Sequence, residues 1–143
     1  MLSATGIGVG YAPFASGTFG SLIAVPLAIV LARTVSGFPI VLFVLSAAVV
    51  FACWVAGEAD RFLGEHDSKK IVIDEIVGML VAVAFLPPKP VVIVTAFLLF
   101  RFFDIVKPWP ANHFDERVGG GPGVVLDDVF AGIYAALATW VLV

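Results

Sequence analysis

Two pairs of adjacent carboxylates stand beside or within apolar stretches of the chain, Asp74-Glu75 and Asp127-Asp128. An ionised carboxylate in such a place is costly unless it is paired or bound to a metal. Four of them brought together would repel one another, and a hard divalent cation that prefers oxygen ligands, such as Mg²⁺, relieves that repulsion. Helix capping is the alternative, but it accounts poorly for two acids at each of two helices. The pattern predicts a magnesium site with these four residues as ligands.

Arg101, Asp104 and Lys107 follow one another at intervals of three residues. On a helix, this spacing places the three side chains within about a third of a turn. Two cations flanking a carboxylate could clamp a phosphate while the acid holds a metal or a water molecule. The same residues, with Trp109 beside them, could equally anchor a helix at a membrane interface. The residues alone leave both interpretations open.

Residues 6–21 form a glycine-rich lead-in to the first apolar run. Backbone N–H groups at a helix start can bind an anion, and the Thr18 and Ser21 hydroxyls flank Gly20 there. No strand precedes this segment, so the glycines are not a dinucleotide-binding fingerprint. An ordinary helix cap after a glycine-rich segment is the more common arrangement. Phosphate binding is the more specific interpretation of the same residues.

Residues of other catalytic chemistries are scarce. Cys53 is the single cysteine, so neither a disulfide framework nor a CxxC metal motif is present. The sequence has no GxSxG motif, and His66-Asp67 and His113 therefore do not indicate a serine hydrolase. We expect His66 to play at most a supporting role.

The elements that carry these residues are predicted to lie in a membrane. Hydrophobic residues make up 61% of the 143-residue chain and charged residues 13%, which leaves too few polar side chains to cover a soluble domain. Continuous apolar runs favour helices over the alternating strands of a barrel. The net charge of -3 argues against a nucleic-acid partner. The length suits a single domain spanning residues 1–143, with no obligatory protein partner inferred.

Five apolar runs predict an all-α bundle with about five membrane-embedded helices. If all five cross, residues 1–20, 57–74 and 104–128 share one side of the membrane. All eleven acidic residues and six of the eight basic ones then lie on or next to that side, which the positive-inside tendency assigns to the cytoplasm. Residues 117–123 are too glycine-rich for a helix or strand and predict a loop. The runs are Phe19–Val35, Phe38–Ala56, Ile71–Leu86, Val91–Phe103 and Val124–Val143.

Several separated motifs together closely resemble the phosphatidylglycerophosphatase A family. The likeness extends from about residue 6 to residue 135, and the motifs occur in the family's order and spacing. Ser16 departs from the pattern, which usually has Pro before the Gly-Thr pair. The matching stretches are Gly8-x-Gly10-x-x-Pro13, Gly17-Thr18-x-Gly20-Ser21, His66-Asp67, Ile71-Val72-Ile73-Asp74-Glu75-x-x-Gly78, Phe100-Arg101-x-x-Asp104-x-x-Lys107-Pro108-Trp109-Pro110, Phe114-Asp115, Gly120-x-x-Gly123 and Asp127-Asp128-x-x-Ala131-Gly132.

The resemblance implies a magnesium-dependent enzyme of the bacterial inner membrane. Such an enzyme hydrolyses phosphatidylglycerophosphate in the bilayer to phosphatidylglycerol and phosphate, with its active site facing the cytoplasm. The alternative is a small membrane transport protein that binds divalent cations, but such a protein would need polar groups on both sides of the bilayer. The implied catalytic residues are Asp74, Glu75, Asp104, Asp127 and Asp128, and the implied substrate-binding residues are Thr18, Gly20, Ser21, Arg101 and Lys107.

Overall fold

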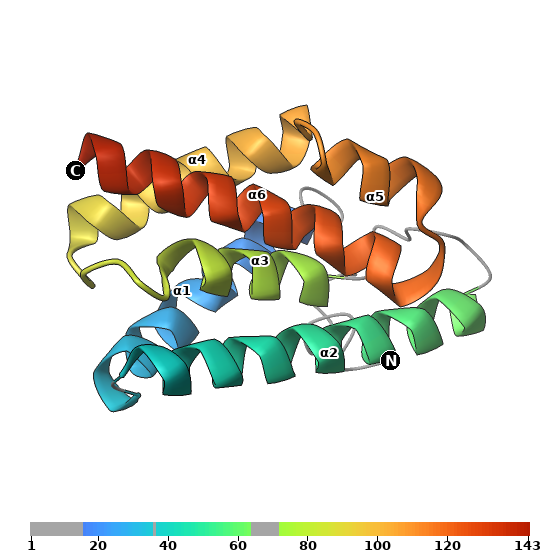
Figure 1. Ribbon diagram of the computed structural model, residues 1–143, viewed down its shortest axis with the longest axis horizontal. Helices are drawn as coiled ribbons and strands as arrows, with labels where there is room; N and C mark the ends of the chain where they lie inside the picture. The colour runs from blue at the N-terminus through green and yellow to red at the C-terminus, as the bar shows by residue number, and fades with distance from the viewer. Residues whose placement is uncertain (1–15, 36, 64–71) are drawn as a thin grey trace.

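The computed structural model describes residues 16–35, 37–63 and 72–143, and in these ranges the regular structure is entirely helical. The prediction of an all-α chain is confirmed. Figure 1 shows the helices packed side by side along the long axis of the molecule. They are α1 (Ser16–Thr34), α2 (Phe38–Leu63), α3 (Ile73–Val83), α4 (Pro90–Val106), α5 (Ala111–Arg117) and α6 (Gly120–Leu142).

The five predicted apolar runs correspond to α1, α2, α3, α4 and α6, while the short helix α5 was not predicted. The loop predicted for residues 117–123 was wrong in its second half, because α6 already begins at Gly120. Pro122 falls in the first turn of α6, where a helix needs no backbone N–H. A Cβ atom on Gly121 would overlap the carbonyl oxygen of Cys53 on α2. Glycine at position 121 therefore allows α6 to pack closely against α2.

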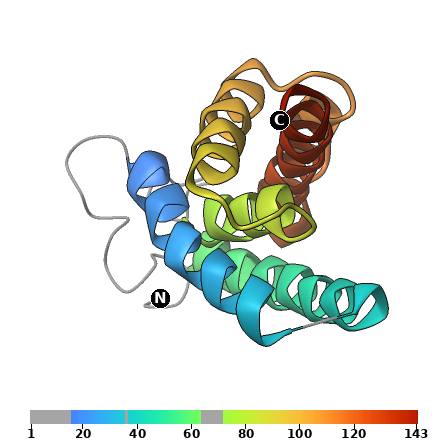
Figure 2. The same cartoon turned by 90° about the vertical axis from the view of Figure 1, so that its left-hand side faces the viewer.

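Helix α3 lies at the centre of the bundle. It contacts α1, α2, α4 and α6, and its most extensive contact is with α6. Seven of its eleven residues are buried, and the end-on view of Figure 2 shows it enclosed by the other helices. An acidic pair in its first turn is thus held inside the protein.

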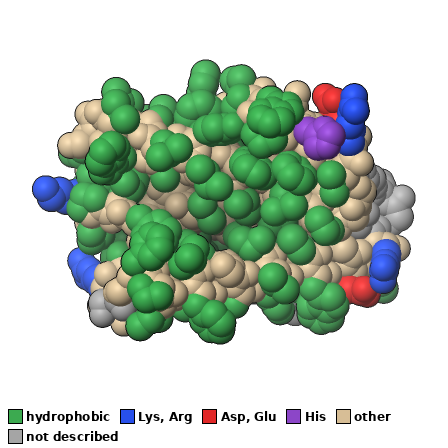
Figure 3. All heavy atoms as spheres, in the orientation of Figure 1, with side chains coloured by type: hydrophobic (Ala, Val, Ile, Leu, Met, Phe, Trp, Pro, Cys, Tyr) green, Lys and Arg blue, Asp and Glu red, His purple; other side chains and the backbone are tan. Residues whose placement is uncertain are grey.

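Within the described ranges, two helices are long and apolar enough to cross a membrane, over Phe38–Ala59 and Gly120–Leu142. The apolar part of α1, Thr18–Thr34, is shorter. Large hydrophobic side chains are exposed along the bundle, including Phe43, Trp54 and Trp140. Figure 3 shows this apolar surface, with charged side chains only at the two ends of the long axis and acidic ones at a single end. This surface is typical of a membrane protein.

Candidate functional site

Three acidic side chains from two helices converge where the first turn of α3 lies beside α6. Asp74 and Glu75 lie in the first turn of α3, and Asp128 lies in α6. One carboxylate oxygen from each lies within 4.8 Å of the others. Asp74 is 7% exposed and Asp128 is 3% exposed, while Glu75 is partly buried. Of the four acids in the two adjacent pairs, the structure therefore brings three together.

A close crossing of α3 and α6 sets this convergence. A Cβ atom on Gly78 would lie 2.7 Å from the backbone oxygen of Asp128, and one on Gly132 would overlap the backbone oxygen of Gly78. The two helices run in the same direction (Figure 1). Each glycine follows its acid by four residues, Asp74 in α3 and Asp128 in α6, so the acids lie at the same level. Glycine at the crossing thus brings the two carboxylates close together.

Helix capping explains only part of this arrangement, because Asp74 and Glu75 lie in the first turn of α3 but Asp128 does not lie in the first turn of α6. The N-cap of α3 is Val72, which forms no side-chain capping bond. Asp128 lies more than two turns into α6, which begins at Gly120, and is beyond the reach of the unpaired N–H groups at its start. Oxygen atoms Asp74 Oδ1 and Glu75 Oε2 are buried without a hydrogen-bond partner. Buried polar atoms are normally paired, so these two oxygens and their donor set fit a bound cation.

Asp127 points to a different partner from its neighbour. Its Oδ2 atom lies 2.7 Å from Nζ of Lys107, and the Asp127 side chain is almost fully buried. Its charge also acts on Asp74, so the ion pair lies beside the three-carboxylate group. Asp127 is not one of the three acids that converge within 4.8 Å. The adjacent acids of this doublet therefore occupy two distinct environments.

Lys107 reaches Asp127 from a turn, which corrects the prediction that it shares a helix face with Arg101. Helix α4 ends at Val106, and Lys107 is its C-cap in the left-handed conformation, with φ of 46°. The following Pro108 disfavours helical backbone at the residue before it. The lysine is thereby turned out of the helix and toward α6.

Arg101 and Asp104 are neighbours on α4, as their spacing predicts. Arg101 Nη1 lies 2.6 Å from Asp104 Oδ2, and both side chains are largely buried. The charges of both residues act on Glu75, and the Asp104 carboxyl interacts with Asp128. The last turns of α4 therefore add one cation and one acid to the edge of the carboxylate group.

The start of α1 packs against the same acidic pair. A Cβ atom on Gly20 would lie 3.2 Å from Cβ of Val72 and 3.7 Å from Cβ of Glu75. Ser21 is fully buried, and Thr18 is partly buried two residues before Gly20. The structure thus brings the predicted substrate-binding segment next to the carboxylates. His66 and Asp67 lie outside the described residues.

One contact near the site was missed by sequence reasoning. The hydroxyl of Tyr134 on α6 donates a hydrogen bond of 2.6 Å to the backbone oxygen of Trp109. Tyr134 follows Asp127 by seven residues, which places it two turns further along the same face of α6. That spacing is the sequence signal that could have predicted the contact. His113 is exposed on α5, with its ring edge-on to that of Phe114.

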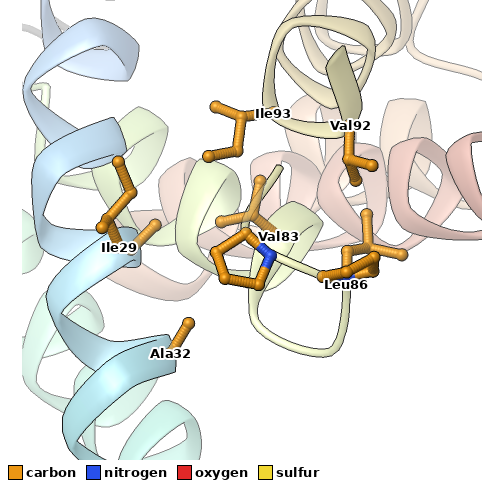
Figure 4. A pocket seen from close by; sticks show the side chains of 9 residues that line it. Ile29, Ala32, Val83, Leu86, Val92 and Ile93 are labelled. Carbon is orange, nitrogen blue, oxygen red and sulfur yellow. The ribbon is translucent and has the colours of Figure 1, made fainter. Parts of the chain in front are cut away.

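A separate hollow lies where the later part of α1 meets the turn after α3 (Figure 4). It is lined by α1, the turn after α3 and the start of α4, with Ile29, Val83 and Ile93 among its side chains. None of the residues that line it is titratable. This hollow offers no catalytic group, and the group of three carboxylates is the candidate active site.

The chain matches the phosphatidylglycerophosphatase A family over residues 2–143. It is similar to phosphatidylglycerophosphatase A of Haemophilus influenzae, with 37% identity over 99% of this chain and 86% of that protein. The Escherichia coli phosphatidylglycerophosphatase A is 35% identical over 94% of this chain and 78% of its own. A Bacteroides thetaiotaomicron protein named "putative phosphatidylinositol-3-phosphatase" is 37% identical over 99% of this chain and 94% of that protein. No solved structure matches.

Proposed function

Since the chain belongs to the phosphatidylglycerophosphatase A family, we propose that it hydrolyses phosphatidylglycerophosphate to phosphatidylglycerol and inorganic phosphate. The observation that carries this proposal is the meeting of Asp74, Glu75 and Asp128 beside buried cationic side chains. A phosphate monoester carries two negative charges, and its hydrolysis depends mainly on positioning and on neutralising charge. The site supplies acidic groups that can position a cation and cationic groups that can neutralise the charge of the phosphate.

A divalent cation, Mg²⁺ in this proposal, would be held by Asp74, Glu75 and Asp128. These residues offer only oxygen donors, which suits a hard cation, and the unpartnered buried oxygens of Asp74 and Glu75 support it. Such an ion would supply positive charge for the phosphate oxygens and lower the pKa of bound water. We predicted Asp127 as a fourth ligand. Because Asp127 contacts Lys107, we propose instead that it holds that lysine in place.

The remaining residues act on the phosphate and on the proton. The guanidinium of Arg101 and the ammonium of Lys107 neutralise phosphate oxygens. Asp104, which interacts with Asp128, accepts the proton of the attacking water. The water oxygen bonds to phosphorus, the bond from phosphorus to the lipid glycerol oxygen breaks, and that oxygen takes up the proton that Asp104 accepted. Thr18, Gly20 and Ser21 contribute backbone and hydroxyl donors from the start of α1.

The bilayer accounts for the position of the site. The lipid tails of the substrate stay in the membrane, so its head group must be met at the border. On the face in Figure 3 the exposed acidic side chains lie at a single end of the apolar bundle, and we propose that the head group approaches from that side. We propose that all five longer helices are embedded and that the site end faces the cytoplasm of a bacterial cell. The six basic residues on that side of the chain support this orientation.

The deciding experiment is phosphate release by the purified protein from phosphatidylglycerophosphate in mixed micelles. We expect turnover with Mg²⁺, loss of turnover in EDTA and recovery when Mg²⁺ is restored. Activity that persists in metal-free buffer would remove the cation from the proposal. A phosphorylated protein that is sensitive to hydroxylamine would show attack by an aspartate in place of water.

The same purified protein can distinguish the proposed activity from two other functions. The Bacteroides relative's name makes phosphatidylinositol-3-phosphate the alternative substrate to compare, and faster release from it would reassign the substrate. A cation carrier would move Mg²⁺ into liposomes without releasing phosphate. The acidic side chains on the face in Figure 3 appear at a single end of the bundle, which favours the hydrolase.

A further inference from the structure

The turn that follows α4 is attached to α6 at two points. At the first, Lys107 Nζ lies 2.7 Å from Asp127 Oδ2; at the second, the Tyr134 hydroxyl donates to the backbone oxygen of Trp109 at 2.6 Å. Asp127 and Tyr134 are seven residues apart in α6, so they occupy the same face two turns from one another. The two contacts together tie a short stretch of backbone to one helix face.

This turn is also closed by a backbone hydrogen bond, in which the Ala111 N–H donates to the Pro108 oxygen at 2.8 Å. Lys107 adopts a positive φ, which is uncommon for a residue other than glycine, and its N–H donates to the backbone oxygen of Phe103. Pro108 and Pro110 have no backbone N–H to donate. The Trp109 side chain is 76% exposed, so packing of its ring does not fix the turn. These backbone bonds lie within the turn or along α4, whereas the hydrogen bond from Tyr134 joins the turn to α6.

Tyr134 is itself well placed for this task. Its ring packs against that of Phe103 on α4, with the centroids 5.6 Å apart. Because this packing limits where the ring can lie, the hydroxyl is held toward the Trp109 carbonyl, two residues beyond Lys107. A loss of the bond would release the backbone next to Lys107 while leaving the ring contact in place.

We propose that Tyr134 is a positioning residue for Lys107. It touches neither the phosphate nor the carboxylates, and it acts by fixing the turn that delivers the ammonium to Asp127 beside Asp74. This inference rests on the proposed function, in which Lys107 neutralises the phosphate of a lipid monoester.

The test compares Tyr134→Phe with the wild type on phosphatidylglycerophosphate. The loss of one hydrogen bond of ordinary strength should lower kcat/KM about three- to tenfold. In a Lys107→Ala background, where no ammonium remains to be placed, the same change should lower kcat/KM less than about twofold. Ser46→Ala is the matched control, because it removes a hydroxyl that donates to Leu42 within α2, and it should leave activity unchanged.

A second measurement does not depend on turnover. Lys107 in the Tyr134→Phe protein should react severalfold faster with a water-soluble acylating reagent, as read by mass spectrometry, while the exposed Lys89 reacts at the wild-type rate. Unchanged reactivity of Lys107, or an equal fold-loss in both backgrounds, would overturn the positioning role. Wild-type activity of Lys107→Ala would instead remove the lysine from the proposed function, so the two failures can be told apart.

Discussion

Adjacent residues in this site have different environments, and the 127–128 doublet shows this most clearly. Asp128 converges with Asp74 and Glu75, whereas Asp127 contacts Lys107. Neighbouring side chains on a helix point about 100° apart. Two identical carboxylates can therefore serve two purposes, one holding a cation and the other holding a lysine.

Replacing Asp127 with Asn and replacing Asp128 with Asn should give different results. Asp128→Asn should abolish turnover at every Mg²⁺ concentration, because it removes a charge from the proposed cation site. Asp127→Asn should lower kcat/KM by about 10–100-fold, the usual effect of losing a supporting partner, with little change in the Mg²⁺ concentration for half-maximal activity. Magnesium titrations of the two variants make the comparison, and a strongly weakened Mg²⁺ response in Asp127→Asn would return Asp127 to the ligand set.

Asp74→Asn provides a third test of the same group. Its buried Oδ1 has no protein partner, so the carboxylate is expected to serve a ligand and not the fold. We expect loss of turnover with unchanged helical content by circular dichroism and normal insertion into membranes. Full activity would exclude Asp74 from the mechanism.

Helices α3 and α6 form the pair of elements on which the site depends. Their backbones approach at Gly78 and Gly132, one turn beyond the acids that each helix contributes. Small residues commonly permit such close approach of helices in membranes. The distance between the carboxylates is therefore coupled to the distance between two helix backbones.

Gly132→Ala should disrupt the site from a position that bears no charge. The added Cβ would overlap the Gly78 carbonyl, and a forced overlap of this kind typically costs 1–3 kcal/mol. We expect a lower midpoint of thermal unfolding and a large loss of activity. Gly119→Ala is the control, since its φ is -79° and a Cβ there would meet nothing within 4 Å. Comparable activity in the two variants would contradict the role of the crossing.

The whole molecule combines an apolar surface with a cluster of acidic side chains. Apolar side chains cover the length of the bundle, and on the face shown in Figure 3 the acidic side chains appear at a single end. Helices α2 and α6 are each long enough to cross a bilayer. This distribution suits an enzyme whose substrate has its head group in water and its tails in lipid.

The proposed orientation can be tested with single cysteines in a Cys53→Ala background. Lys89 precedes α4 and Glu116 lies in α5, and both side chains are exposed. In intact bacterial cells, a maleimide that cannot cross the inner membrane should label Lys89→Cys and should label Glu116→Cys only after permeabilisation. The opposite labelling would place the site outside the cytoplasm.

The sequence by itself determined the helical class, the apolar surface and the acids and cations of the site, because these follow from composition, from continuous apolar runs and from short-range spacing. It also contained Pro108, the signal that α4 stops before Lys107. Only the tertiary structure decided that Asp127 and Asp128 separate, that α6 begins at Gly120 and that Tyr134 meets Trp109. Each depends on how one helix is rotated and how closely it approaches another, which is set by side chains distant in the sequence.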